Sequence, residues 1–176
     1  FRVHWSVLIS TLYWTTQHST VKLPKHVRNN IERACSQIKY KGHDPNKDTF
    51  IITCDSEQQR MCWMQGISPC LSHSLYRGHW ISNQHRRMTI AEMFRLQGIL
   101  PNYFKSFAST SKMGQLLGNA MSVNVIERLF IATLEAAGFF PEKSLTDRWK
   151  TGQAIKELKQ TIGRPFSILQ DPKAAR

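Results

Sequence analysis

The sequence predicts an α/β fold, because strand-like and helix-like patterns alternate along its 176 residues. Apolar and polar side chains alternate over residues 1–10, and residues 50–53 form a β-rich run. Apolar side chains recur at helical spacing over residues 26–40, 89–98 and 125–138. With 41% hydrophobic residues the chain can bury a core, and its length fits one domain, or one small domain and part of another.

The first half is predicted to contain a half-buried strand, a helix and a second strand. Residues 1–10 form the first strand, and the helix over residues 26–40 ends at Gly42, a residue that readily adopts the left-handed backbone of a helix end. The helix carries one apolar face, made of Val27, Ile31, Ala34, Cys35 and Ile38. Residues 12–24 and 41–48 are predicted loops. The second strand covers residues 50–53, and residues 66–80 are predicted to form turns with short strands.

The second half begins with a helix whose start is encoded locally. Thr89 and Glu92 form a capping box, in which each side chain bonds the backbone NH of the other residue. Gly98 ends this helix and Pro101 prevents its continuation. On this local interpretation, Arg95 and Gln97 are exposed helix residues.

Two more helices are predicted further on. The first carries an apolar stripe, formed by Val125, Ile126, Leu129, Phe130 and Thr133, and ends at Gly138. From residue 141 the chain is polar and basic, but Ala154, Ile155 and Leu158 support one more amphipathic helix, and the last residues are expected to be disordered.

The charge balance favours a polyanionic partner. The chain has 24 basic and 12 acidic residues, a net charge of +12, and nucleic acid is the commonest large polyanion. The alternatives are a solvated basic patch or an acidic protein partner. No apolar run approaches the roughly 18–20 residues that span a bilayer. An intracellular protein is therefore expected. Because the chain does not begin with Met, we also expect it to be a fragment or a processed chain.

The four cysteines favour free thiols over a metal site. Cys54, Cys62 and Cys70 are evenly spaced, with His73 and His79 nearby, a combination that raises the alternative of a zinc site. No C-x-x-C pair is present, and tight ligand pairs are usual in structural zinc sites. Buried thiols in a reducing compartment are the preferred interpretation, and no metal site is predicted.

The most specific pattern in the chain is a pair of motifs. The first comprises Arg87, Thr89, Glu92, Arg95, Leu96, Gln97, Gly98 and Pro101, and the second comprises Gly118, Asn119, Ala120 and Met121. Together they resemble the last two sequence motifs of the cytosine-C5 DNA methyltransferases, R-x-L-T-x-x-E-x-x-R-L-Q-G-F-P and G-N-A/S-V. The chain departs by a one-residue insertion before Pro101 and by Met121 in place of valine.

The resemblance implies a cofactor and a fold. In the family the second motif closes one side of the S-adenosylmethionine pocket, which makes Asn119, Ala120 and Met121 cofactor neighbours. From the residues alone, the same turn can be a helix start at which Asn119 caps exposed NH groups. The implied fold is the C-terminal portion of a Rossmann-like, S-adenosylmethionine-dependent methyltransferase domain with a small mixed target-recognition lobe.

The resemblance also implies DNA contacts. The family carries a Thr-Leu dipeptide that holds the DNA backbone near the flipped base, and Cys70 and Leu71 match it with cysteine in place of threonine. Cys70, Leu71, Ser72 and Arg77 are the predicted DNA-binding residues. Tyr76, His79 and Trp80 add aromatic and basic groups that suit a nucleic-acid surface, although a half-buried strand explains them equally well. His85, Arg86 and Arg87 can contact phosphate, but a solvated or structural role is the preferred interpretation.

Several family motifs are missing, and this limits the predicted activity. The sequence shows no Phe-x-Gly-x-Gly cofactor loop, upstream Pro-Cys-Gln, Glu-Asn-Val or Gln-x-Arg-x-Arg motif. Cys70 follows a proline but lies too late in the chain to be the family nucleophile, so no catalytic residue is predicted. The chain is interpreted as the C-terminal fragment or subunit of a DNA (cytosine-5-)-methyltransferase that is inactive alone. Its partners would be double-stranded DNA and a separate subunit, or an N-terminal half, with the catalytic cysteine.

The predicted domains are a partial target-recognition region (1–84), the C-terminal part of the catalytic domain (85–140) and a basic tail (141–176). Two alternatives remain open, a non-catalytic DNA-binding protein derived from the family and a tRNA cytosine-C5 methyltransferase. A nuclear location is expected if the organism is eukaryotic, and no membrane association is expected.

Overall fold

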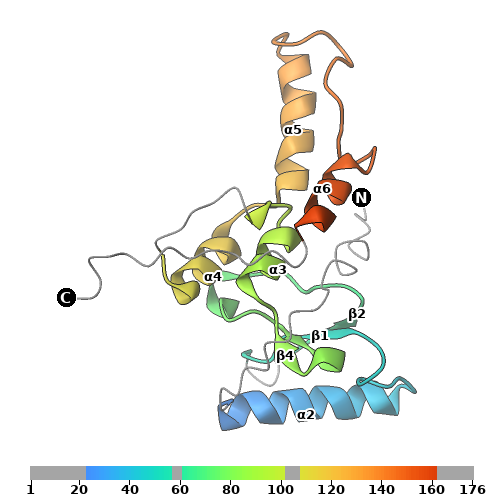
Figure 1. The fold of residues 1–176 in the computed structure, drawn as a ribbon, viewed down its shortest axis with the longest axis vertical. Helices are drawn as coiled ribbons and strands as arrows, with labels where there is room; N and C mark the ends of the chain where they lie inside the picture. The colour runs from blue at the N-terminus through green and yellow to red at the C-terminus, as the bar shows by residue number, and fades with distance from the viewer. Residues whose placement is uncertain (1–22, 57–60, 102–107, 162–176) are drawn as a thin grey trace, which may run out of the picture.

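The computed structural model describes residues 23–56, 61–101 and 108–161 and confirms a mixed α/β chain (Figure 1). The strand predicted over residues 1–10, most of the loop over residues 12–24 and the disorder predicted for the last residues lie outside the described residues. Helix α2 (Lys25–Tyr40) matches the predicted helix. It ends as Gly42 predicts: Gly42 has φ +84°, its NH donates to the Lys39 carbonyl at 2.9 Å, and the His43 NH donates to the Ile38 carbonyl at 3.2 Å.

Within the described residues the sheet has four short antiparallel strands in the order β2 (Trp63–Gln65), β1 (Phe50–Ile52), β3 (Trp80–Ile81) and β4 (Arg86–Arg87). Of these, the sequence predicts only β1 and short strands within residues 66–80. The three residues of β1 are all buried, because both faces of the sheet are covered. Phe50 and Ile52 pack with α2, whereas Ile51 belongs to a second cluster on the opposite face.

This second cluster contains the elements that carry the two motifs. Helices α3 (Ile90–Leu96) and α4 (Thr110–Asn119) contribute Met93, Phe94, Met113 and Leu117 to it. Figure 1 shows α2 on one side of the sheet, with α3 and α4 on the other. The sheet therefore separates the α2 lobe from the motif-bearing helices.

The remaining α-helices of the described residues are α5 (Val123–Ala136) and α6 (Gln153–Gln160), both as predicted. The apolar stripe of α5 is not buried by the described residues: Leu129 and Phe130 are 56% and 59% exposed. The segment after residue 141 returns to the core, where Leu158 is 1% exposed. An ion pair fixes this return, because Nε of Arg148 donates to Oε1 of Glu127 at 2.9 Å.

Every strand pair described is antiparallel, so the Rossmann-like portion of the predicted fold stays a prediction. Among the described residues, no helix has the length and hydrophobicity required to span a membrane.

Candidate functional site

The first motif is built around a buried ion pair. The predicted capping box at Thr89 is confirmed: the Thr89 hydroxyl accepts from the Glu92 NH at 3.2 Å, and Oε2 of Glu92 accepts from the Thr89 NH at 2.7 Å. The same carboxylate accepts two bonds from Arg86, at 2.7 and 2.8 Å, and both side chains are less than a tenth exposed. The Glu92 carboxylate thus joins the helix start to strand β4.

Arg87 is engaged in a second structural pair. Its guanidinium donates two bonds to Asp55, at 2.5 and 2.8 Å, and one to the Gly78 carbonyl at 2.9 Å. Phosphate contact is therefore not the role of Arg86 and Arg87 in this structure, and the structural alternative is confirmed. His85 is exposed, with a left-handed backbone at φ +50°.

The local interpretation of Arg95 and Gln97 as exposed residues is wrong. Arg95 is 4% exposed, and its Nη1 donates to the Thr161 carbonyl at 3.4 Å. Burial lowers the pKa of Arg95 below its usual value, a shift that the charge of Glu92 partly opposes. Arg95 and Gln97 are both buried because segments from much later in the chain return and cover this end of the helix.

Gln97 connects the first motif directly to the second. Its side-chain amide donates to the carbonyls of Leu117, at 3.0 Å, and Ala120, at 3.3 Å, and its Oε1 accepts from the Ser122 hydroxyl at 2.8 Å. Its backbone carbonyl accepts from the Val123 NH at 2.8 Å. One residue therefore holds the end of α4, the turn and the start of α5.

The turn itself differs from the sequence prediction. Gly118 and Asn119 are the last residues of α4, whereas the sequence predicts a helix start there, and the N-cap of α5 is Ser122. Asn119 is therefore no N-terminal cap. Its side chain is exposed, Ala120 is partly buried and Met121 is 61% exposed. The exposed Met121 lies just before α5, the helix whose apolar stripe is uncovered.

The predicted DNA-contact residues lie on the loop before and after the 3-10 helix η2 (His73–Leu75). Cys70 and Arg77 are exposed and Ser72 is partly buried, but the Leu71 side chain is 7% exposed and belongs to the core. The Arg77 guanidinium lies 5.5 Å from the centroid of the Tyr76 ring. Leu71 can thus offer DNA only its backbone, whereas the others offer side chains.

Helix α4 brings this loop against the turn because two of its residues lack side chains. A Cβ built on Gly118 would lie 2.2 Å from the carbonyl carbon of Ser72, and one built on Gly114 would lie 2.0 Å from the carbonyl oxygen of Tyr76. Such distances leave no room for any other residue. The predicted DNA-contact loop and the helix ending in the predicted cofactor turn are consequently in backbone contact.

His79 and Trp80 are not part of this surface. His79 is 1% exposed, and Trp80 lies in β3 and packs against the α2 cluster. Burial lowers the pKa of His79 below its usual value, although hydrogen bonds with the backbone of Cys70 and Pro69 raise it. His79 thus supports the loop from beneath, and of the two alternatives for this residue the structure favours the buried one.

The cysteines are free, but they are not all buried as expected. Cys54 is buried and Cys35 is partly buried, whereas Cys62 and Cys70 are exposed. Burial raises the pKa of the Cys54 thiol to about 11. Within the described ranges, no three His, Cys, Asp or Glu residues are grouped to hold a metal ion.

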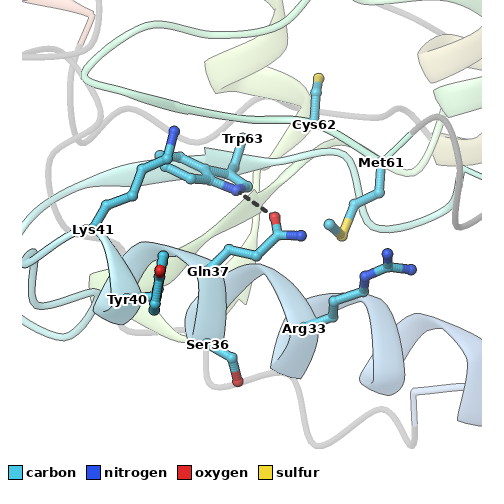
Figure 2. Close-up of a pocket in the computed structure, with 8 residues that line it drawn as sticks. All are labelled: Arg33, Ser36, Gln37, Tyr40, Lys41, Met61, Cys62 and Trp63. Carbon is cyan, nitrogen blue, oxygen red and sulfur yellow. Dashed lines mark hydrogen bonds between the residues drawn. The ribbon is translucent and has the colours of Figure 1, made fainter.

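One surface feature is not predicted by the sequence. A groove of about 660 Å³ lies between α2 and β2, and Figure 2 shows its lining. Its α2 side includes Arg33, Gln37 and Tyr40, whose spacing of four and three residues places them on one helix face. That spacing is the available signal, but without β2 it gives no reason to expect a groove.

The two motifs and the loop around η2 form one structural unit, held together by Gln97 and by the contact of α4 with the loop. The chain belongs to the family described as C-5 cytosine-specific DNA methylase, whose profile matches residues 5–135. A comparison with curated proteins found no match. Membership of this family supports a methyltransferase assignment and the mixed α/β class of fold.

Proposed function

We propose that the chain is the C-terminal part of a DNA (cytosine-5-)-methyltransferase, which transfers a methyl group from S-adenosylmethionine to C5 of cytosine in DNA. The observation that carries this proposal is the Gln97 side chain, which ties the first motif to the turn of the second. In this proposal residues 1–84 are part of the target-recognition region, residues 85–140 close the catalytic domain and residues 141–176 follow it as a basic tail.

The turn fits one wall of a cofactor site. S-adenosylmethionine carries polar groups, an adenine ring and a sulfonium-bound methyl, so that a site for it needs hydrogen-bonding and apolar surface side by side. Asn119 offers an exposed amide, and Ala120 and Met121 offer apolar surface beside it. When bound, the cofactor supplies the methyl group, and these residues would hold it from one side.

The loop fits the DNA backbone. Arg77 offers an exposed guanidinium, Ser72 a hydroxyl and Cys70 a thiol, while Leu71 can act through its backbone. Phosphate contacts of this kind position a protein on DNA without reading its sequence. The backbone contact of Gly118 with Ser72 would keep the DNA next to the cofactor wall.

The uncovered stripe of α5 fits a further protein surface. Leu129 and Phe130 are each more than half exposed, although their helix is well formed, and Met121, in the turn before this helix, is 61% exposed. Exposed apolar patches of this kind mark interfaces. The proposed partner is a catalytic half, in the same polypeptide or a separate subunit, that carries the nucleophilic cysteine and the other cofactor wall.

The proposal is tested by a methyl-transfer assay with labelled S-adenosylmethionine. The 176-residue chain alone should transfer nothing, and the protein in which it is joined to or mixed with the catalytic half should methylate duplex DNA. Asn119→Ala should weaken cofactor binding to that complete protein, whereas the control Lys112→Ala, at an exposed position in the first turn of α4, should not. Transfer by the chain alone that vanished in Cys70→Ser would contradict the assignment.

A competition binding assay between tRNA and duplex DNA distinguishes the possible substrates. Preferred binding of tRNA over duplex DNA would favour the tRNA methyltransferase alternative. Duplex binding with no transfer by any combination would favour a non-catalytic DNA-binding protein. A DNA substrate implies an intracellular location, nuclear in a eukaryotic cell.

A further inference from the structure

The groove between α2 and β2 is positively charged and partly aromatic. Arg33, Gln37, Tyr40 and Lys41 line one side and Trp63 the other, and among the described residues no acidic side chain lines it. Helix α2 contains four Lys and Arg residues and one glutamate, all exposed, and Lys41 follows at its end. Charge complementarity therefore selects an anionic occupant.

The two cations of the groove are held apart. Lys41 Nζ lies 4.9 Å from the centroid of the Trp63 ring, and Nε1 of Trp63 donates to Oε1 of Gln37 at 3.0 Å. Figure 2 shows Lys41 beside the indole and Arg33 toward the other end of the groove. Neither cation forms an ion pair with a carboxylate of the described residues, whereas Arg86 and Arg87 both do.

We infer that this groove binds the phosphodiester backbone of duplex DNA, as a second contact separate from the Cys70 loop. A backbone offers anionic groups in a row, which suits two separated cations, and the amide of Gln37 between them can donate a hydrogen bond to a phosphate. DNA as the ligand rests on the proposed function. The assignment of this groove is independent of the Cys70 loop.

The position of the groove supports a separate contact. Helix α2 packs on the face of β1 that carries Phe50 and Ile52, whereas Leu71 of the DNA-contact loop packs with Ile51 on the other face. Helix α2, which lines the groove, and helix α4, which packs against the loop, lie on opposite sides of the sheet (Figure 1). The stretch of backbone in the groove is different from the stretch at the loop, so that the groove increases affinity without reading the target base.

The first test is a protection experiment on the 176-residue chain with random-sequence duplex DNA at low salt. Lysine acetylation followed by mass spectrometry should show Lys41 protected by DNA, while Lys39, an exposed control on the same helix that does not line the groove, should react as before. Alkylation of exposed Cys70 reports the loop in the same sample.

The second test compares two double variants that remove the same charge on or beside the same helix. Arg33→Gln with Lys41→Gln should flatten the plot of log affinity against log salt by roughly one unit for each phosphate that the protein no longer binds. The control, Arg28→Gln with Lys39→Gln, should change the slope much less. Circular dichroism and thermal melts confirm that both variants fold.

The outcomes separate the two assignments. Equal protection of Lys41 and Lys39, or equal salt dependence of affinity in the two double variants, would overturn the assignment of the groove as a DNA contact. Helix α2 would then be only a diffuse positive surface. Protection of Cys70 without Lys41 would also overturn it, while leaving the loop assignment intact. Protection of Lys41 without protection of Cys70 would support the groove assignment and contradict the loop assignment. Protection of neither residue would contradict both assignments.

Discussion

Glu92→Gln should be among the most destabilising conservative changes in this chain. The substitution keeps the size of the side chain but removes the charge that accepts two bonds from Arg86 at 2.7 and 2.8 Å. Arg86 is then left as a buried cation without its carboxylate, since its side chain is 9% exposed. Removing one partner of a buried ion pair costs about 3–5 kcal/mol.

The measurement is urea unfolding together with a thermal melt. In a protein of this size a loss of about 3–5 kcal/mol lowers the melting temperature by roughly 6–20 °C. The matched control is Glu32→Gln, at an exposed position of α2, which should change the free energy of unfolding by about 0.5 kcal/mol or less.

A double variant tests the cause. Arg86→Met in the Glu92→Gln background removes the unpaired cation, so that the two changes together should cost less than the sum of the two single changes. Additive costs, or a cost below about 1 kcal/mol for Glu92→Gln alone, would refute the assignment of this pair as the structural centre of the motif.

Three further predictions concern packing, pH and thiol reactivity. Gly118→Ala should cost roughly 1–3 kcal/mol in urea unfolding despite the better helix propensity of alanine, because its methyl group would meet the Ser72 backbone, and unchanged stability would contradict that contact. Burial lowers the pKa of His79 below its usual value of 6.5, with Asp55 and Arg87 nearby, so the unprotonated imidazole stabilises the fold fully above pH 6.5 and this contribution is lost as the pH falls below it; His79→Gln should flatten the decline in the free energy of unfolding as the pH is lowered from about 7. Cys54, with a pKa of about 11, should resist maleimide in the folded protein while exposed Cys62 reacts at once, and equal rates would show that Cys54 is accessible.

Features encoded by neighbouring residues could be predicted from the sequence. The apolar spacing of α2, its end at Gly42 and the capping box of Thr89 and Glu92 all depend on residues within a few positions of one another. Each is confirmed, because a helix start or stop is decided by local backbone geometry and by side chains that reach only one turn away. The resemblance of the two motifs also needed no structure, and it led to the correct family.

Only the tertiary structure decided which of these residues are buried and which are left on the surface. Arg95 and Gln97 would be ordinary exposed positions on an isolated helix, but Thr161 and the α4–α5 turn return to cover them. Conversely, the stripe of α5 is as apolar as a core face, yet the described residues leave Leu129 exposed. The physical reason is that burial depends on which distant segments pack together, and hydrophobic spacing along one helix does not identify its partner.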